Sequence, residues 1–203
     1  MGSAMNILLN EHRFLGKMLD FTQELADRMR RGERVQPPML GRAGEFFRVC
    51  LEGCLLAKEE SLLFTKLQTK GFSRQTGLIA SMLVDHERGR RLVREMKKAA
   101  ADYEAGSGAA GGRWAAAALD FVDLMRAHLR EEETSLFMMA DIFMQPSEQA
   151  ELAEEFKRLE EAQTISGRHR LIHRMPDELS GETKERAMDS LGTPSTRAPS
   201  GAI

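Results

Sequence analysis

The feature that most constrains the fold is the spacing of apolar residues, which recur every three or four positions along four long stretches. These stretches cover residues 6–31, 38–70, 73–103 and 114–143, and Gly or Pro residues separate them. Such spacing gathers the apolar side chains on one face of an α-helix. β-branched residues are scarce, and the alternation of apolar and polar residues typical of a half-buried strand is absent. The sequence therefore predicts an all-α fold, an antiparallel up-down-up-down four-helix bundle.

The 203 residues are enough for one domain with appendages. We expect the bundle to span residues 5–145 and a helical extension to span residues 147–179, with a fifth, more polar helix over residues 147–174. From residue 180 to residue 203 the composition shifts to Gly, Ser, Thr and Pro with few large apolar groups. This composition predicts a disordered tail.

Charge and hydropathy argue against two classes of partner. The 29 basic and 31 acidic residues nearly cancel, so no net charge favours nucleic acid. No run of about 18 apolar residues could span a bilayer, which argues against a membrane protein. Cys50 and Cys54 lie four residues apart in a predicted helix, where a disulfide would constrain little, so we expect two buried free thiols. Without a signal-like start, these thiols favour a cytoplasmic protein.

Polar residues occupy positions where a bundle core normally has apolar ones: His12, Glu59, Glu60, His86, His128 and Glu132. In an antiparallel bundle these side chains can come level with one another inside the core. Burying an unpaired histidine or carboxylate costs several kcal/mol, and a bound metal is one arrangement that removes this cost. Imidazole and carboxylate ligands together suit iron, manganese or zinc. The pattern therefore indicates a metal site.

The spacing within single helices sharpens this hypothesis. His128 and Glu132 are four residues apart, so they project from the same face and could bind one metal or bridge two. Of the adjacent Glu59 and Glu60, only one should point inward, and Glu60 shares a stripe with Leu63. Taken alone, a pair such as His128 and Glu132 more often belongs to a solvated helix face, and Glu59 and Glu60 could be two residues of a charged face.

Four stretches taken together resemble the hemerythrin-like domains, also called HHE cation-binding domains. They are NEHR at residues 10–13, CLLAKEESLLF at 54–64, MLVDHERGR at 82–90 and HLREEETSLFMMAD at 128–141. The resemblance covers roughly residues 5–178. It implies a left-handed four-helix bundle around a non-heme di-iron centre, and such centres bind dioxygen, nitric oxide or peroxide, or store and sense iron.

Carried over position by position, the resemblance assigns His12, His86 and His128 as terminal ligands, and Glu60 and Glu132 as carboxylates that bridge the metals. The sequence departs from the family pattern in the second helix, where members usually have Cys-His-His-x-Lys-Glu-Glu. Here both histidine positions are leucine, Leu55 and Leu56. Because a leucine cannot coordinate a metal, one metal loses a histidine.

Three outcomes follow from this departure. A two-metal site could persist with solvent, Glu59 or Cys54 in the gap, since carboxylate-rich helical sites vary in their ligands. A single metal could instead be held by four ligands, namely His86, His128, Glu60 and Glu132, or the metal could be lost. The cofactor is thus iron, dinuclear or mononuclear, or none.

Two functions of different classes follow from these outcomes. The first is a non-heme iron protein that binds or senses dioxygen, nitric oxide, peroxide or iron, and whose partner is a small diatomic ligand or peroxide. The second is a metal-free helical bundle that signals or assembles through its surface, with a protein partner or a second copy of the chain. No residue is distinctive for catalysis as opposed to binding, so enzymatic activity is not the favoured interpretation.

Overall fold

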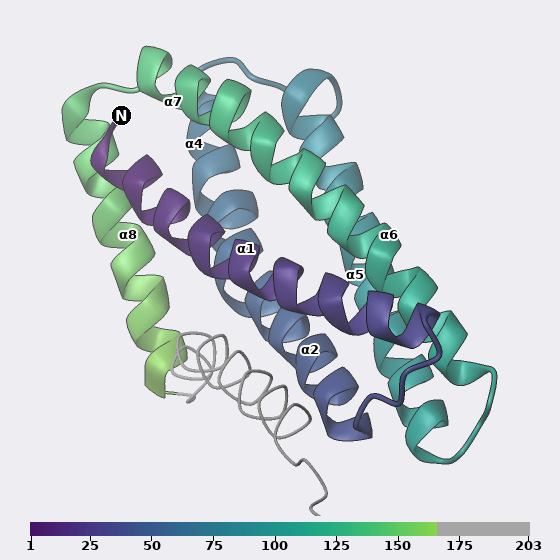
Figure 1. Ribbon diagram of the computed structural model, residues 1–203. Coiled ribbons are helices and arrows are strands. Elements are labelled where there is room, and N and C mark those ends of the chain that lie inside the picture. The colour runs from purple at the N-terminus through teal and green to yellow at the C-terminus, as the bar shows by residue number, and fades with distance from the viewer. Residues whose placement is uncertain (166–203) are drawn as a thin grey trace, which may run out of the picture.

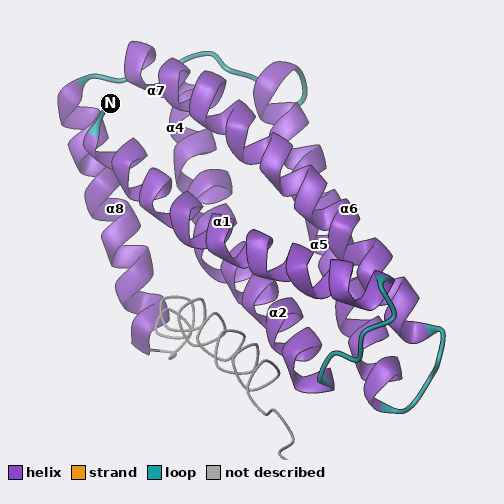
Figure 2. Ribbon diagram, viewed as in Figure 1, coloured by secondary structure: helices purple, strands orange, loops and turns teal. Residues whose placement is uncertain are grey.

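The computed structural model describes residues 1–165, and nearly all of these residues are helical. The bundle contains α1 (Ser3–Arg30), α2 (Pro37–Val49), α3 (Leu55–Lys58), α4 (Phe64–Thr69), α5 (Gly77–Glu104), α6 (Ala110–Glu131) and α7 (Phe137–Phe143). A further helix, α8 (Pro146–Ile165), follows the bundle. The described residues form no strand, which confirms the predicted all-α class (Figure 2).

Three π-helical turns interrupt two of the four bundle helices. The turns η1 (Cys50–Cys54) and η2 (Glu59–Leu63) join α2, α3 and α4 into one long helix, and η3 (Glu132–Leu136) joins α6 to α7. A π turn closes i to i+5 hydrogen bonds, so it holds one more residue than an α-helical turn and is common at functional sites. Compared with an uninterrupted α-helix, the residues after such a turn are therefore shifted by about one position around the helix axis.

The four long helices run antiparallel, as predicted (Figure 1). Figure 1 shows α6 lying beside both α1 and α5, and α5 in turn packs against α2. Large buried aromatic side chains fill the core, among them Trp114, Phe47 and Phe121. The rings of Phe47 and Phe121 lie 4.5 Å apart between centroids. Among the described residues, no helix combines the length and apolar character needed to cross a membrane.

The start of the third long helix differs from the prediction. Residue 73 was expected to begin it, but α5 begins at Gly77, with Thr76 as its extended N-cap residue. The Ser73 hydroxyl instead accepts a hydrogen bond from the backbone N–H of Gln75 at 3.0 Å, inside the connector. Gly77 has a φ of +71°, a left-handed conformation that glycine adopts readily. Ser73 therefore stabilises the turn before the helix.

The helix α8 lies along α1 and also contacts the π turns η1 and η2 (Figure 1). Its apolar side chains Leu152 and Phe156 are fully buried against the bundle. The ammonium group of Lys58, which has no solvent exposure, donates hydrogen bonds to Glu11 of α1 and Glu160 of α8. This ion triad fastens α8 to two bundle helices.

The described residues cover only part of the predicted C-terminal regions. The first 19 residues of the expected extension, 147–165, belong to α8. The remainder of that extension and the tail predicted for residues 180–203 lie outside the described residues.

Candidate metal centre

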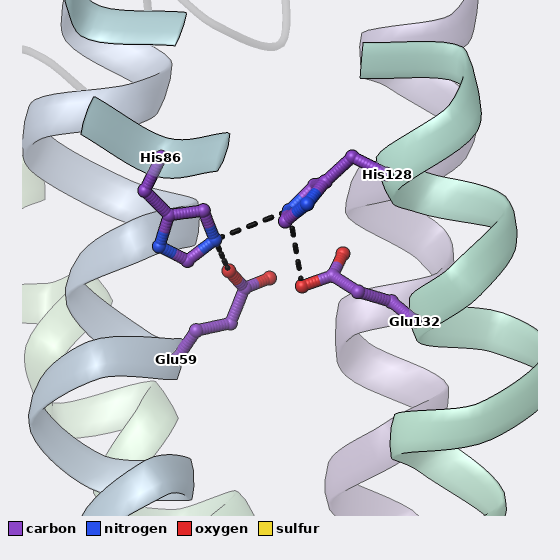
Figure 3. Close-up of side chains that lie close together, drawn as sticks. All are labelled: Glu59, His86, His128 and Glu132. Atoms are coloured by element: carbon purple, nitrogen blue, oxygen red, sulfur yellow. Dashed lines mark hydrogen bonds and ion pairs between the residues drawn. The ribbon is translucent and has the colours of Figure 1, made fainter. Parts of the chain in front are cut away.

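Four buried side chains point toward one another in the middle of the bundle: Glu59, His86, His128 and Glu132 (Figure 3). They come from η2, α5, α6 and η3, and each is at most 1% exposed. One candidate ligand atom from each residue lies within 4.8 Å of all the others. Two imidazoles and two carboxylates therefore surround one small volume inside the core.

The donor atoms in this cluster face one another at close range. Nε2 of His86 lies 3.1 Å from Nε2 of His128 and 3.3 Å from Oε2 of Glu59. Nε2 of His128 lies 3.3 Å from Oε1 of Glu132. Two Nε2 atoms aimed at each other cannot both donate a proton to the contact, but both can present lone pairs to a cation.

Each buried glutamate of the cluster is the first residue of a π turn. Glu59 begins η2 and Glu132 begins η3. In an uninterrupted α-helix, Glu60 would lie on the same face as Leu63, and the sequence prediction was based on this shared apolar stripe. The extra residue of η2 shifts that position to Glu59. The expectation that Glu60 points inward is therefore wrong: Glu59 is fully buried, whereas the Glu60 side chain is 23% exposed.

Each of the three histidines also has a carboxylate near its outer nitrogen, Nδ1. Nδ1 of His86 lies 2.8 Å from Oε1 of Glu60, and Nδ1 of His12 lies 3.0 Å from Oε1 of Glu133. Nδ1 of His128 lies 3.5 Å from a carboxylate oxygen of Asp85. A carboxylate that accepts the Nδ1 proton leaves Nε2 free to bind a metal and orients the ring.

His12 lies on the other side of Glu132 from His128. Its Nε2 is 3.3 Å from Oε2 of Glu132, and the residue is only 4% exposed. The two oxygens of Glu132 thus face two different histidines, as a bridging carboxylate would. His12 is nevertheless outside the group of four mutually close ligands.

The positions where the family resemblance implies a further histidine hold no donor atom. Leu55 and Leu56 are both buried, each about 1% exposed, and leucine cannot coordinate a metal. The Cys54 thiol is buried and forms no disulfide, as predicted, and burial raises its pKa to about 12, which disfavours the metal-binding thiolate. The cytoplasmic location inferred from the cysteines stays a prediction.

Unpartnered polar atoms show that the residues present fit a metal. Both carboxylate oxygens of Glu59, both of Glu132 and Nε2 of His12 are buried without a hydrogen-bond partner. Most buried polar groups in proteins have such a partner, and an unsatisfied carboxylate in a core is costly. A divalent cation between the two glutamates would bind their carboxylate oxygens and remove this cost.

The charges of the cluster perturb its titration. Burial lowers the pKa of His86, but hydrogen bonds to Glu59 and Glu60 and the charges of Glu59 and Glu132 outweigh it and raise the pKa to about 9. The pKa of His12 rises to about 9 in the same way, chiefly through Glu132. Burial and the neighbouring charge of Glu132 raise the pKa of Glu59 to about 7. Without a metal, the site therefore holds protons where a cation would otherwise supply the positive charge.

Burial also acts on the remaining two members of the cluster. It lowers the pKa of His128, but the charge of Glu132 raises that pKa above its ordinary value. The pKa of Glu132 itself is held far below its ordinary range because the charges of His128 and His12 outweigh its burial. Glu132 is therefore the carboxylate that stays ionised at the centre of the site.

The structure thus brings together four of the five sequence-predicted site residues, His12, His86, His128 and Glu132, and places Glu60 behind His86. Sequence reasoning missed the central position of Glu59 and the outer carboxylates Asp85 and Glu133. The signal for Glu59 and Glu133 is the recurrence of adjacent glutamates, at residues 59–60 and at residues 131–133. Glu59 and Glu132 point inward, and the glutamate that follows each of them reaches a histidine of another helix.

Comparison with known proteins agrees with this geometry. The model of the Hemerythrin HHE cation binding domain family matches residues 3–140, which end before α8 begins. Searches of curated proteins and of solved structures gave no match to the chain. Because the match covers more than half of the 203 residues, the chain belongs to the hemerythrin HHE cation-binding domain family.

Proposed function

We propose that the chain is a non-heme iron protein whose main metal position is ligated by Glu59, His86, His128 and Glu132. The observation that carries this proposal is the group of four buried ligands whose carboxylate oxygens have no hydrogen-bond partner. Four ligands of mixed nitrogen and oxygen type suit iron, manganese or zinc. The Hemerythrin HHE family match makes a cation the expected occupant.

We assign a second, weaker metal position to the His12 side of the same centre. Glu59 and Glu132 would be shared between the positions, and His12 would be the one ligand belonging to the second position alone. Leu55 and Leu56 leave this position without the further histidine that the family resemblance implies. One tightly bound iron per chain, with a second that is readily lost, is the expected stoichiometry.

The protein would hold such a metal in a buried site with only four protein ligands. The surrounding core excludes water, the histidines present their Nε2 atoms, and four ligands leave room for an exogenous molecule at a six-coordinate metal. Iron held in this way supplies reversible binding of a small ligand such as dioxygen, nitric oxide or peroxide. Sensing or storage of iron itself would use the same ligands.

Metal content tests the proposal directly. Purified chain is loaded with ferrous iron without oxygen, desalted, and measured by plasma mass spectrometry before and after a second desalting step. We expect close to one iron per chain after both steps, and up to two after the first. The variant E59Q, which keeps the size of a ligand but removes its charge, should lose most of the tightly bound iron.

Addition of nitric oxide to the ferrous-loaded protein then tests for an open position. We expect a new visible absorption in the parent and a much weaker one in E59Q. A parent chain that retains neither iron, manganese nor zinc would overturn the proposal. It would favour the alternative of a metal-free helical module, which Leu55 and Leu56 motivate.

A further inference from the structure

Two contacts from outside the cluster hold the His86 ring. Its Nδ1 lies 2.8 Å from Oε1 of Glu60, which fixes the rotation of the ring in its own plane. The Phe64 ring stacks against it, with centroids 5.8 Å apart and planes inclined by 10°. The in-plane and stacking contacts together leave Nε2 directed at the metal position.

Arg90 and Arg74 contact the residues that position His86. Arg90, one helical turn after His86 on α5, donates to Oε1 of Glu60 at 2.6 Å. Arg74 donates to the backbone carbonyl of Glu60 at 2.8 Å, and its guanidinium lies 5.9 Å from the centroid of the Phe64 ring. Glu60 is therefore anchored through both its side chain and its backbone.

The other two histidines lack this support. Glu133, the outer partner of His12, is 42% exposed, and Asp85 lies 3.5 Å from His128, beyond a strong hydrogen bond. Within residues 1–165, neither carboxylate pairs with an arginine or a lysine. An exposed, unanchored partner orients an imidazole less well than one fixed by a charge-assisted bond.

We propose that Glu60 and Arg90 are a positioning pair that holds the His86 imidazole in its metal-binding orientation. The inference rests on the proposed metal-binding function, and neither residue of the pair touches the metal. Glu60 accepts the Nδ1 proton and strengthens His86 as a donor at Nε2. Arg90 bonds to the same carboxylate oxygen, so it fixes Glu60 and moderates how much negative charge reaches the ring.

Cobalt(II) is a suitable probe because its visible absorption reports ligand geometry and its binding involves no change of oxidation state. The full chain is titrated with Co²⁺ alone, and the dissociation constant and visible band positions are recorded for the parent, E60Q, R90Q and R90K. Thermal unfolding of each metal-free variant shows that the fold is kept. E87Q is the matched control, because Glu87 lies 3.9 Å from Arg90 with a side chain 65% exposed.

Loss of an outer ligand partner typically weakens metal binding by roughly 10- to 100-fold. We expect E60Q to show a loss in this range together with shifted cobalt bands. R90Q should weaken binding less, within about tenfold, because Glu60 remains but is no longer anchored. R90K should recover part of that loss, since an ammonium group can still pair with Glu60, and E87Q should match the parent.

Two outcomes are decisive against this inference. A parent that binds Co²⁺ while E60Q binds it equally well with unchanged bands would overturn the positioning role and leave the proposed function intact. A parent that binds neither cobalt nor iron would overturn both. An E87Q variant as weak as E60Q would also overturn the inference, because the effect would then follow net charge and not the contact with His86.

Discussion

The two halves of the proposed centre both face Glu132, but they differ in the histidines that they contain. The His86–His128 half has two histidines that belong to it alone, and Arg90 anchors one of them through Glu60. The His12 half has a single histidine, whose outer partner Glu133 is 42% exposed, and the positions where the family resemblance implies a further histidine hold the buried Leu55 and Leu56. A carboxylate common to both halves therefore does not make the two proposed metal positions equivalent, since we expect the histidines to decide which one is filled.

Removal of one histidine from each half gives the strongest test of whether the two halves bind metal unequally. H128Q should weaken binding of the first metal by more than about 100-fold, because even an outer partner contributes roughly 10- to 100-fold. H12Q should leave the first dissociation constant within about tenfold of the parent value and should abolish the weaker second binding step. Titration with Co²⁺ or Zn²⁺ separates these steps. Equal losses in the two variants would contradict an unequal centre.

Restoring a ligand to the weaker half should make the halves alike. Leu55 lies four residues before Glu59 across α3, so the two share a helix face, whereas Leu56 is one position further around. We therefore expect L55H to retain two metals per chain through repeated desalting, and L56H to remain near one. Plasma mass spectrometry gives both numbers. Two retained metals in L56H and one in L55H would instead point to Glu60 as the inward residue.

The pH dependence should differ in sign between the metal-free and the metal-loaded chain. The pKa of His86 and of His12 is raised from 6.5 to about 9, because Glu59, Glu60 and Glu132 outweigh burial. A raised pKa contributes stability that is complete below pH 6.5 and is lost as pH rises through about 9. The raised pKa of Glu59, about 7, acts in the same direction.

The melting temperature of the metal-free chain should therefore fall between pH 6.5 and 9, while metal affinity rises because fewer protons must be displaced. Thermal unfolding in a chelator and in excess Zn²⁺, at half-unit pH steps, checks both directions. A metal-free melting temperature that is constant over this interval would contradict the charge balance assigned to the cluster.

The smallest expected effect concerns the ion triad beside the His12 half. E160Q should lower the free energy of unfolding by about 1 kcal/mol, because Lys58 keeps Glu11 as a partner and loses one charge-assisted bond. Urea unfolding followed by fluorescence of the buried Trp114 measures the change. The exposed neighbour provides the control E161Q, which should match the parent. A larger effect in E161Q would show that α8 is held by other contacts.

Much of the fold could be predicted from the sequence because helical periodicity is a long-range pattern. Four stripes of apolar residues and the Gly and Pro residues between them were sufficient for the class and the antiparallel order. The start of α5 was misplaced by four residues because Ser73 caps a local turn and no helix. Serine stabilises both kinds of structure, so its presence alone does not distinguish them.

The site shows a different limit. His12, His86, His128 and Glu132 could be proposed from the sequence because polar residues interrupt apolar stripes. Glu59 could not be distinguished from Glu60, since the choice depends on a single π turn that no residue type announces. Because the predicted helix was out of phase by one residue, Glu60 was predicted as a ligand, whereas in the structure it is the outer partner of His86.

The buried Lys58 bears on where the autonomous folding unit ends. The family match stops at residue 140, yet the fully buried ammonium group of Lys58 has Glu160 as one of its two acidic partners. Phe156 completes the same interior from beyond that boundary. The part of the chain that matches the family is therefore shorter than the part that packs into one core. A fragment that ends at residue 140 would leave Lys58 without one partner and would expose the surface that α8 covers, next to the helical segments that supply His12 and Glu59.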